Sequence, residues 1–243
     1  MARIGRAKVK SEGTFRDRHP SQFNPDRLAF TRGAAGIGIA AVCLAVFACL
    51  FTIVRRNRSQ AVDAAITIKV QGQKNRYFDR LMHIVSWPGF PPQSRLLPPT
   101  LSAILWFLGF RLEAIFQMMA WGTGVISFTV KRAMKRPRPA KDDSTIRVVA
   151  ANIGGSSFPS GHVLNYLGVY GFLTFLAHTW IRPKGIRRTI VAFLVSLVSL
   201  VGPSRVYLGH HWFTDVTASY MLGTSYLLLL TNIYRKVRTW MHR

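Results

Sequence analysis

Long apolar runs separated by short basic segments dominate the chain from residue 33 onward. The first run, residues 33–54, contains no charged residue. At about 1.5 Å per residue, a helix of that length crosses a hydrocarbon core of roughly 30 Å. The other runs cover about residues 96–110, 114–130, 163–181, 189–201 or a little further, and 214–234. The pattern predicts an all-α integral membrane protein, a bundle of six spanning helices.

Polar segments flank and interrupt this membrane domain, which covers residues 33–234. Residues 1–32 are basic and have no apolar period, which predicts a mobile or surface-lying tail, and residues 235–243 form a short basic tail at the other end. Residues 60–95 combine two amphipathic pieces with a turn-rich aromatic stretch that begins at Trp87. Trp and Tyr favour the headgroup level, so this region is predicted to lie at the membrane interface.

A cleaved signal peptide is the alternative interpretation of residues 33–54. Its basic leader would be unusually long, and Arg55-Arg56-Asn57-Arg58 stands where a cleavage site needs small residues. We therefore favour a membrane span. Cys43 and Cys49 lie in this run, where a helix places them on different faces and too far apart for a disulfide.

Composition and charge indicate a membrane protein with an anionic partner. The chain of 243 residues is 49% hydrophobic and 17% charged, and its 33 Lys and Arg against 9 Asp and Glu give a formal net charge of +24. Nucleic acids and anionic bilayer surfaces both attract such a charge. The basic residues lie between apolar runs instead of along one stripe, and no nucleic-acid motif is visible. We therefore expect a bilayer, and no nucleic acid, as the partner.

An even number of spans places both termini on the same side of the membrane. The loop at residues 182–188 and the segment at residues 235–238 share that side with the N-terminus, and all three are basic. The positive-inside rule makes this side cytoplasmic. The difference in basic charge between the two sides is small, because residues 55–95 on the opposite side also carry eight Lys and Arg.

Three polar clusters interrupt the apolar architecture. The first holds Lys131 and Arg138, the second is the run 159–162, and the third extends from Ser204 to Asp215. With six spans, the helix ends that carry these clusters all lie at one membrane face. Ionisable groups at membrane depth are costly, so their convergence indicates a functional site.

The residue types in the clusters suit phosphoryl transfer, which needs fixed cations around the phosphoryl oxygens. Lys131, Arg138 and Arg205 can supply them, because Arg binds phosphate in a bidentate fashion and Lys adds a point charge. Ser160 and Gly161, at a helix start, offer free backbone N–H groups, a hydroxyl and close backbone approach to an anion. We expect these five residues to bind phosphate.

His211 and Asp215 are four residues apart, so a helix places them on one face. The carboxylate can then hold one imidazole nitrogen while the other attacks phosphorus, and His162 can serve as the general acid. No further ligand accompanies His211 and Asp215, and the cations already neutralise the phosphate. We therefore expect neither a metal nor another cofactor.

The three clusters together resemble the signature motifs of the type 2 phosphatidic acid phosphatase superfamily. They read Lys131-x6-Arg138-Pro139, Pro159-Ser160-Gly161-His162 and Ser204-Arg205-x5-His211-x3-Asp215. All three match in order and without departure, and the resemblance covers roughly residues 96–234.

The resemblance implies a metal-independent lipid phosphatase that acts through a phosphohistidine intermediate. It assigns His211 as the nucleophile, Asp215 as the residue that orients it and His162 as the acid for the leaving group. The positions that it assigns to phosphate binding are Lys131, Arg138, Ser160, Gly161 and Arg205. In bacterial members with six spans the site usually faces the periplasm, which implies an inner-membrane enzyme with its site outside the cytoplasm.

The substrate and other functions stay open at the level of sequence. Phosphatidic acid, phosphatidylglycerophosphate and undecaprenyl pyrophosphate share the phosphate head that the motifs bind. A lipid phosphotransferase or a vanadium-dependent haloperoxidase would use the same motifs, although haloperoxidases are soluble as a rule. A non-catalytic protein could use the site to bind or transport anionic lipids. No pattern in the sequence sets an oligomeric state.

Simpler structural roles are the alternative for single residues of the clusters. Lys131 and Arg138 could be membrane-flanking charges, and Ser160 could be the N-cap of a helix. His211 and Asp215 could form a structural hydrogen-bonded pair. The three-part match favours the catalytic interpretation.

Four polar residues beside the motifs stay outside the predicted site. We expect Arg132, Lys135 and Arg136 to be solvated charges near the interface. His210 is expected to line the site entrance or to stack on Trp212.

Overall fold

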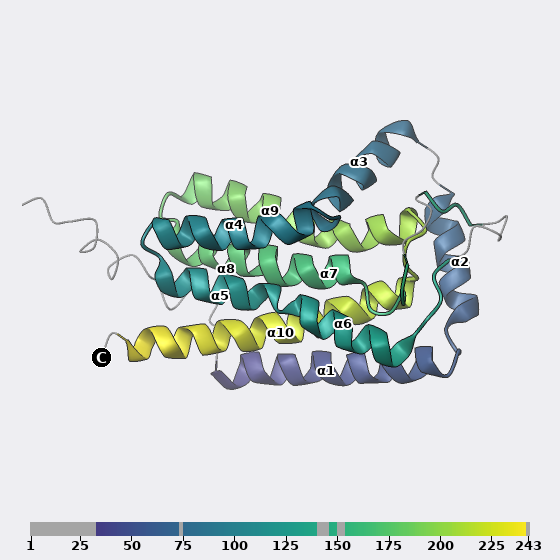
Figure 1. Cartoon of the computed structure of the whole chain (residues 1–243), viewed down its shortest axis with the longest axis horizontal. Helices are drawn as coiled ribbons and strands as arrows, with labels where there is room; N and C mark the ends of the chain where they lie inside the picture. The colour runs from purple at the N-terminus through teal and green to yellow at the C-terminus, as the bar shows by residue number, and fades with distance from the viewer. Residues whose placement is uncertain (1–32, 73–74, 140–145, 150–153, 242–243) are drawn as a thin grey trace, which may run out of the picture.

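The computed structural model describes residues 33–72, 75–139, 146–149 and 154–241, and within these ranges it contains helices and turns but no strand (Figure 1). The predicted all-α class is confirmed, whereas the predicted tail at residues 1–32 lies outside the described residues. In chain order the helices are α1 (Gly33–Arg55), α2 (Gln60–Gln71), α3 (Arg76–Ser86), the 3-10 turn η2 (Trp87–Gly89), α4 (Gln93–Phe107), α5 (Arg111–Trp121), α6 (Thr123–Met134), α7 (Gly161–Asn165), the π-helical turn η3 (Tyr166–Tyr170), α8 (Gly171–Trp180), α9 (Lys184–Tyr207) and α10 (Phe213–Trp240).

Each predicted apolar run lies in helix, and the runs lie side by side along the long axis of the molecule (Figure 1). The first two are α1 and α4, and the third is divided between α5 and α6. The fourth is the continuous stretch of α7, η3 and α8, and the last two are α9 and α10. Of the described helices, α1 and α9 are by themselves long and apolar enough to cross a membrane.

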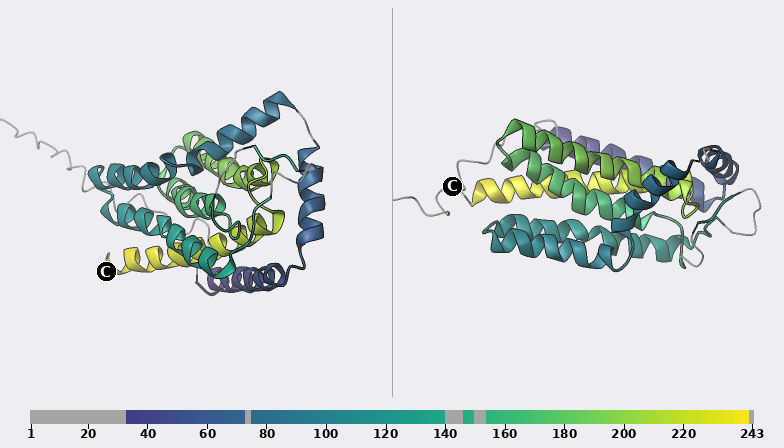
Figure 2. Two further views of the ribbon diagram at one scale, coloured as in Figure 1. Left: turned by 45° about the vertical axis from the view of Figure 1, so that its right-hand side comes forward. Right: turned by 90° about the horizontal axis from the view of Figure 1, so that it is seen from above.

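The helices are arranged around α10. Helix α1 packs along it in the opposite direction, and the backbone N–H of Gly33 donates to Oδ1 of Asn232 (3.0 Å). Seen from above, α4 and α5 lie on one side of α10, and α8 and α9 lie on the other (Figure 2). Helix α2 crosses one end of the bundle, and α3 projects from the same end (Figure 1). The polar clusters come together at this end.

A side chain from α10 explains why the third run forms two helices. The hydroxyl of Tyr226 donates to the carbonyl of Met119 (2.5 Å), which also accepts from the backbone N–H of Gly122 (2.8 Å). Next to this break, a Cβ on Gly168 of η3 would lie 2.2 Å from the carbonyl oxygen of Ala120, so only glycine permits the approach. Helix α6 then packs on α7, which brings the first and second polar clusters together.

The last helix continues past the predicted run and ends at Trp240. The predicted basic tail therefore begins as an extension of α10. Arg235 and Arg238 are buried, and their guanidinium groups lie 5.0 Å from the ring of Phe175 and 4.3 Å from the ring of Trp180, both on α8. These cation–π contacts hold residues 235–240 within the bundle.

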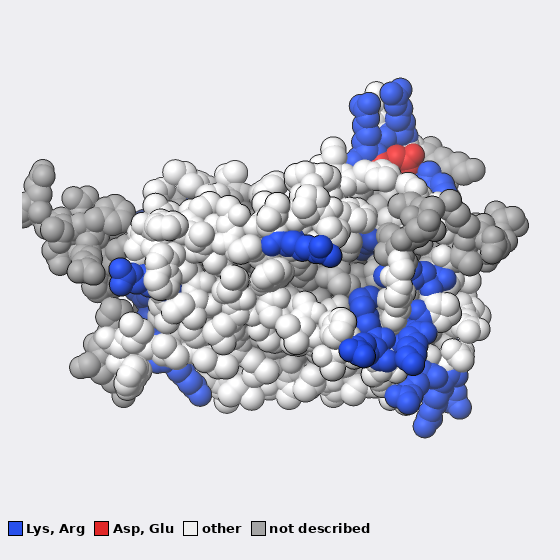
Figure 3. Space-filling view, viewed as in Figure 1, with Lys and Arg blue, Asp and Glu red and all other residues white. Residues whose placement is uncertain are grey.

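Large apolar side chains are exposed along the outer surface of the bundle, and on the face drawn in Figure 3 most Lys and Arg lie toward its ends, with one basic side chain across the middle. Phe107 is 86% exposed and Val125 is 70% exposed, and Lys and Arg gather mainly at the end where α2 and α3 lie (Figure 3). Cys43 and Cys49 are free thiols, as their spacing predicts. An exposed apolar surface of this kind is expected on a protein that is solvated by lipid.

Candidate active site

The three predicted clusters meet around a cavity of about 360 Å³ at the α2 end of the bundle. Six of the eight predicted site residues line it, namely Lys131, Arg138, Gly161, His162, Arg205 and His211. The other two, Ser160 and Asp215, are fully buried beside it. Helices α6, α7 and α9 and the turn before α10 each contribute, so residues more than 70 positions apart in sequence share one pocket.

The basic residues of this pocket have no carboxylate partner among the described residues. Arg205 is fully buried, and its Nη1 donates to the Ser86 hydroxyl (2.9 Å). Arg138 donates through Nη1 to the carbonyl of His210 (2.7 Å), and Lys131 donates through Nζ to the carbonyl of Ser156 (2.6 Å). Their positive charge is therefore not compensated by a side chain in these ranges.

Every described Asp and Glu is already paired with another arginine. The pairs are Asp63 and Asp215 with Arg136, Asp79 with Arg147, and Glu113 with Arg238. Several buried polar atoms at the pocket also lack a hydrogen-bond partner in the described structure: Nε of Arg138, Nε and Nη2 of Arg205, Nε2 of His162 and Oγ of Ser160. Unpartnered buried donors are costly, so the pocket is built to receive an anion with several acceptor oxygens.

His211 presents one ring nitrogen to this pocket. Its Nδ1–H donates to the carbonyl of Ser157 (2.7 Å), and because a carbonyl can only accept, the proton is on Nδ1 and the lone pair is on Nε2. Nη1 of Arg138 lies 3.3 Å from Nε2. Burial and then the charges of Arg138, Arg205 and Lys131 hold the pKa of His211 well below its ordinary value. The ring is therefore a neutral imidazole, the form that can act as a nucleophile.

Asp215 lies next to this nitrogen, but at a longer distance than we expected. Its Oδ2 is 3.6 Å from Nδ1 of His211, beyond normal hydrogen-bond length, and it accepts instead from the backbone N–H of Trp212 (2.9 Å). The direct hydrogen bond that fixes the ring comes from Ser157, which sequence reasoning did not identify.

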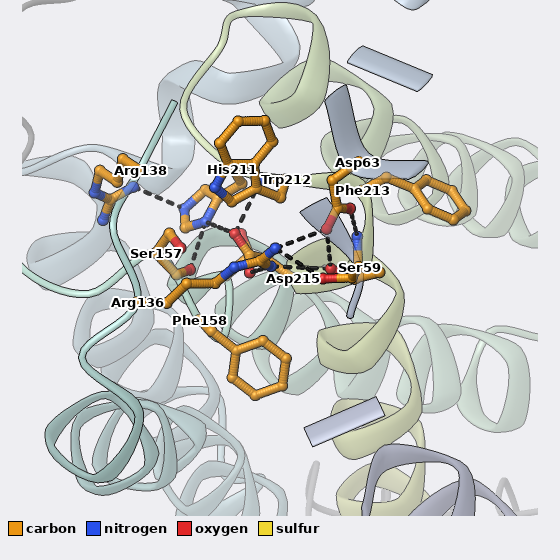
Figure 4. A network of polar contacts seen from close by, with 12 residues as sticks. Ser59, Asp63, Arg136, Arg138, Ser157, Phe158, His211, Trp212, Phe213 and Asp215 are labelled. Carbon is orange, nitrogen blue, oxygen red and sulfur yellow. Dashed lines mark hydrogen bonds and ion pairs between the residues drawn. The ribbon is translucent and has the colours of Figure 1, made fainter. Parts of the chain in front are cut away.

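The prediction that Arg136 is a solvated charge is wrong. Only 9% of its side chain is exposed, and it lies between Asp215 and Asp63, with Nη1 2.5 Å from Oδ1 of Asp215 and Nη2 2.6 Å from Oδ2 of Asp63 (Figure 4). The cause is local, because Lys135 adopts a left-handed conformation that ends α6 and turns the next residue inward. Arg132 and Lys135 are exposed, as predicted.

His162 is held by the turn that connects α3 and α4. The ring of Phe90 meets the ring of His162 edge to face at 4.7 Å, and the guanidinium of Arg205 lies 4.8 Å from the centre of the same Phe90 ring. A Cβ on Gly89 would lie 2.2 Å from Cδ2 of His162. This turn, which the sequence pattern assigned only to the membrane interface, therefore forms part of the wall around two predicted site residues.

Ser160 and His210 differ in part from the structural roles that the sequence predicted for them, a helix N-cap for Ser160 and an entrance or stacking residue for His210. Ser160 stands at the N-cap position of α7, but its side chain makes no capping bond, and its backbone N–H donates to the Ser219 hydroxyl (2.7 Å). His210 is buried and contacts Phe90 at 6.0 Å, whereas the indole N–H of Trp212 donates to the carbonyl of Pro137. His210 thus contributes its carbonyl to Arg138 instead of lining the cavity.

Comparison with known proteins agrees with this geometry. The model of the PAP2 superfamily matches residues 112–239, which is more than half of the chain. This chain is a member of the PAP2 superfamily. Phosphatidylglycerophosphatase B of Bacillus subtilis (strain 168) is 26% identical over 196 residues, which cover 79% of this chain and 93% of the relative. The resemblance inferred from the three motifs is confirmed.

The PAP2 fold is also found in a solved structure. The crystal structure of the first transmembrane PAP2 type phosphatidylglycerolphosphate phosphatase from Bacillus subtilis superposes with a TM-score of 0.71 and 23% sequence identity, and the match covers 82% of this chain and 96% of that chain. At this identity the likeness concerns the fold. It supports the arrangement of helices described above.

Several residues of the site lie outside the PAP2 match. Asp63, Ser86 and Phe90 precede residue 112, yet they contact Arg136, Arg205 and His162. One signal in the sequence could have identified the first of them. Asp63, Thr67 and Gln71 recur every four positions in α2 and are all buried, which is the spacing of a polar face turned inward.

Proposed function

We propose that this PAP2 member is an integral membrane enzyme that hydrolyses a phosphomonoester or pyrophosphate on a membrane lipid, without a metal, through a phosphohistidine at His211. The observation that carries the proposal is the orientation of this histidine. Its unprotonated Nε2 faces a cavity in which Lys131, Arg138 and Arg205 have no carboxylate partner among the described residues. A nucleophile next to fixed cations is what phosphoryl transfer requires.

In the first step the phosphoryl oxygens bind to the three cations, and Nε2 of His211 attacks phosphorus. The N–P bond forms while the bond between phosphorus and the lipid oxygen breaks, and His162 gives its proton to the departing oxygen. Positive charge develops on the imidazole ring as the bond forms. The carbonyl of Ser157 on Nδ1 and the carboxylate of Asp215 at 3.6 Å are placed to stabilise it.

In the second step water cleaves the phosphohistidine. The neutral His162 left by the first step takes a proton from the water, the new P–O bond forms, and the N–P bond breaks with its electrons returning to Nε2. Inorganic phosphate leaves the three cations. Among the described residues no group of three His, Cys, Asp or Glu side chains is placed to hold a metal ion, so the proposed steps use side chains alone.

We further propose that the six apolar helical stretches all cross the bilayer. The large apolar side chains exposed on the outer surface support this placement, as does the transmembrane character of the solved relative. Basic residues at the start of α9 and the end of α10 mark the end opposite the pocket, and the basic residues 1–32 precede α1, which starts at that same end. The pocket end also carries many Lys and Arg (Figure 3), some of which line the pocket itself. We propose that the end with the basic loop and termini is cytoplasmic, which places the pocket on the periplasmic side of a bacterial inner membrane. Helix α3 would lie at the headgroups. Its Tyr77 is 80% exposed, and Trp87, the residue that follows the helix, is 56% exposed.

Phosphatidylglycerophosphate is the first substrate to test, because both relatives are named for it. Phosphatidic acid and undecaprenyl pyrophosphate are the alternatives. The test is phosphate release by the detergent-purified protein in EDTA, with the wild type, His211→Ala and a control, His83→Ala, which removes an exposed histidine of α3. We expect turnover in EDTA that disappears only in His211→Ala. Turnover that needs a metal, or that survives in His211→Ala, would overturn the assignment.

The same assay separates the competing functions. A lipid phosphotransferase would transfer the labelled phosphate to a second lipid instead of releasing it. A non-catalytic lipid-binding protein would bind the substrate vesicles without either product.

A further inference from the structure

The two groups next to Nδ1 of His211, the carbonyl of Ser157 and the carboxylate of Asp215, are both held by one residue, Arg136. Its backbone carbonyl accepts from the N–H of Ser157 (2.8 Å), and the carbonyl of Ser157 in turn holds Nδ1. Its guanidinium donates through Nη1 to Oδ1 of Asp215 (2.5 Å), the carboxylate whose other oxygen faces Nδ1. A displacement of Arg136 would therefore move both groups that orient the nucleophile.

Arg136 is itself held by α2, a helix outside the PAP2 match. Nη2 donates to Oδ2 of Asp63 (2.6 Å) and to the hydroxyl of Ser59 (3.1 Å). Asp63 is fully buried, and it also accepts from the backbone N–H and the hydroxyl of Thr214, both at 2.8 Å. Thr214 belongs to the first turn of α10, the turn that carries Asp215. Asp63 thus joins α2, Arg136 and the start of α10 in one network.

The charges of this network also matter for the reaction. Two carboxylates and one guanidinium leave one net negative charge, next to the ring on which positive charge develops. Without Asp63, Arg136 would neutralise Asp215, and the developing imidazolium would lose its counterion. Electrostatic stabilisation of a developing charge is strong in a buried site, where water does not screen it.

We propose that the Asp63–Arg136 pair positions the nucleophile, by fixing Ser157 and Asp215 around His211 and by preserving the negative charge of Asp215. The inference rests on the proposed function. The competing interpretation is a purely structural link between α2 and α10. The chain contains a suitable control for it, because Glu113 and Arg238 form another buried ion pair (2.5 Å) that joins α5 to α10 at the far end of the bundle.

The test compares Asp63→Asn, Arg136→Lys and the control Glu113→Gln in the full-length, detergent-purified enzyme. Rapid acid quench with a ³²P-labelled lipid phosphate measures the rate at which phosphoenzyme forms. Inhibition by inorganic phosphate measures how well the pocket still binds the anion. Thermal melting shows that each variant is folded.

We expect Asp63→Asn to form phosphoenzyme on the order of 10-fold to 100-fold more slowly, since small misplacements of a reacting group have effects of this size. The inhibition constant for phosphate should stay within about twofold, because Lys131, Arg138 and Arg205 are untouched. Arg136→Lys keeps the charge but cannot donate to both carboxylates in the same fork geometry. Its rate of phosphoenzyme formation should therefore lie between those of Asp63→Asn and the wild type. Glu113→Gln should melt at a lower temperature and react at the wild-type rate.

Three results would overturn the inference: a wild-type rate in Asp63→Asn, an equal loss of rate in Glu113→Gln, or phosphate affinity that falls in parallel with the rate. Should Asp63→Asn fail to fold, Arg136→Lys decides, and a wild-type rate in that variant overturns the inference. A wild-type enzyme that turns over its substrate without a phosphoenzyme would instead contradict the proposed function.

Discussion

Burial and the three pocket cations together favour the neutral form of His211, the proposed nucleophile. The proposed nucleophile, His211, can attack only when it is neutral, so kcat/KM should fall as the pH drops through its pKa in the folded enzyme. Burial and the charges of Arg138, Arg205 and Lys131 lower that pKa. The neutral form therefore persists to a lower pH than in an ordinary histidine, and the acidic limb of the profile should lie well below pH 6.5.

Replacing Lys131 by Met should move this acidic limb to higher pH. The substitution removes one of the charges that disfavour the imidazolium, so the pKa of His211 should rise. The measurement is kcat/KM against pH for both enzymes on one substrate, so that ionisation of the substrate cancels. An acidic limb that stays at the same pH would contradict the electrostatic argument.

Activity that climbs without limit at alkaline pH would contradict His162 as the general acid, since the two-histidine scheme requires a bell-shaped profile.

Arg95 is a fourth basic residue on the lining of the cavity, in the first turn of α4 next to Ser94. It lies outside the three motifs, and we expect it to contact the second phosphate of a substrate that has two. We expect Arg95→Gln to reduce kcat/KM about tenfold for phosphatidylglycerophosphate or undecaprenyl pyrophosphate and to leave phosphatidic acid, which has one phosphate, unchanged. Arg80→Gln, an exposed charge of α3, is the control. An equal loss on all three lipids would exclude this role.

Sequence reasoning at the residue scale succeeded where chemistry restricts the choice of side chain. A phosphate site with a histidine nucleophile requires these eight residue types, which predicts one shared site, and the eight residues do gather at one pocket. It failed for Arg136, since a charge just after a helix is usually solvated, and only the left-handed Lys135 turns this one inward. The carbonyl of Ser157 could not be predicted either, because every residue has a carbonyl and only the fold selects one.

At the scale of elements, the turn between α3 and α4 is the least expected part of the site. In this turn, the ring of Phe90 contacts His162 and Arg205. The turn also contains Gly89, where His162 leaves no room for a side chain. Hydropathy places this turn at the interface, but it cannot show that the turn packs on residues more than 70 positions away. The predicted apolar runs, by contrast, all lie in helix, because burial from water needs only apolar composition and length.

Gly89→Ala should impair catalysis while the fold persists. The new Cβ would lie 2.2 Å from Cδ2 of His162, so the ring of the general acid must move. We expect kcat to fall on the order of tenfold or more, with little change in melting temperature. Gly38→Ala is the control, because no heavy atom lies within 4 Å of its new Cβ. Normal activity in Gly89→Ala would show that the turn moves to accept the new methyl group and does not fix the ring of His162.

Division of a run into two helices could not be predicted from hydropathy. The break between α5 and α6 depends on the hydroxyl of Tyr226, which reaches the carbonyl of Met119 from another helix. Long-range hydrogen bonds of this kind leave no periodic trace in the sequence.

At the scale of the whole molecule, exposed lysines at the two ends of the bundle allow a test of which end faces the cytoplasm. Lys135 is exposed at the pocket end, and Lys184 is exposed where α9 begins at the other end. In a background with Cys43 and Cys49 replaced by Ala, a membrane-impermeant maleimide should label Lys135→Cys in intact cells. It should label Lys184→Cys only after the membrane is permeabilised. The reverse pattern would place the pocket in the cytoplasm.

The pocket cations, which have no carboxylate partner in the part of the chain that the structure describes, also affect the stability of the resting protein. On the proposed function, inorganic phosphate is a product that binds the folded pocket and has no matching site in the unfolded chain, so we expect it to act as a stabilising ligand. At a free concentration 100 times its dissociation constant, this linkage adds about 2.7 kcal/mol to the free energy of unfolding. Product inhibition and protection against denaturation are then the same binding event. A preparation freed of phosphate should be the most active form of the protein and also the shortest-lived.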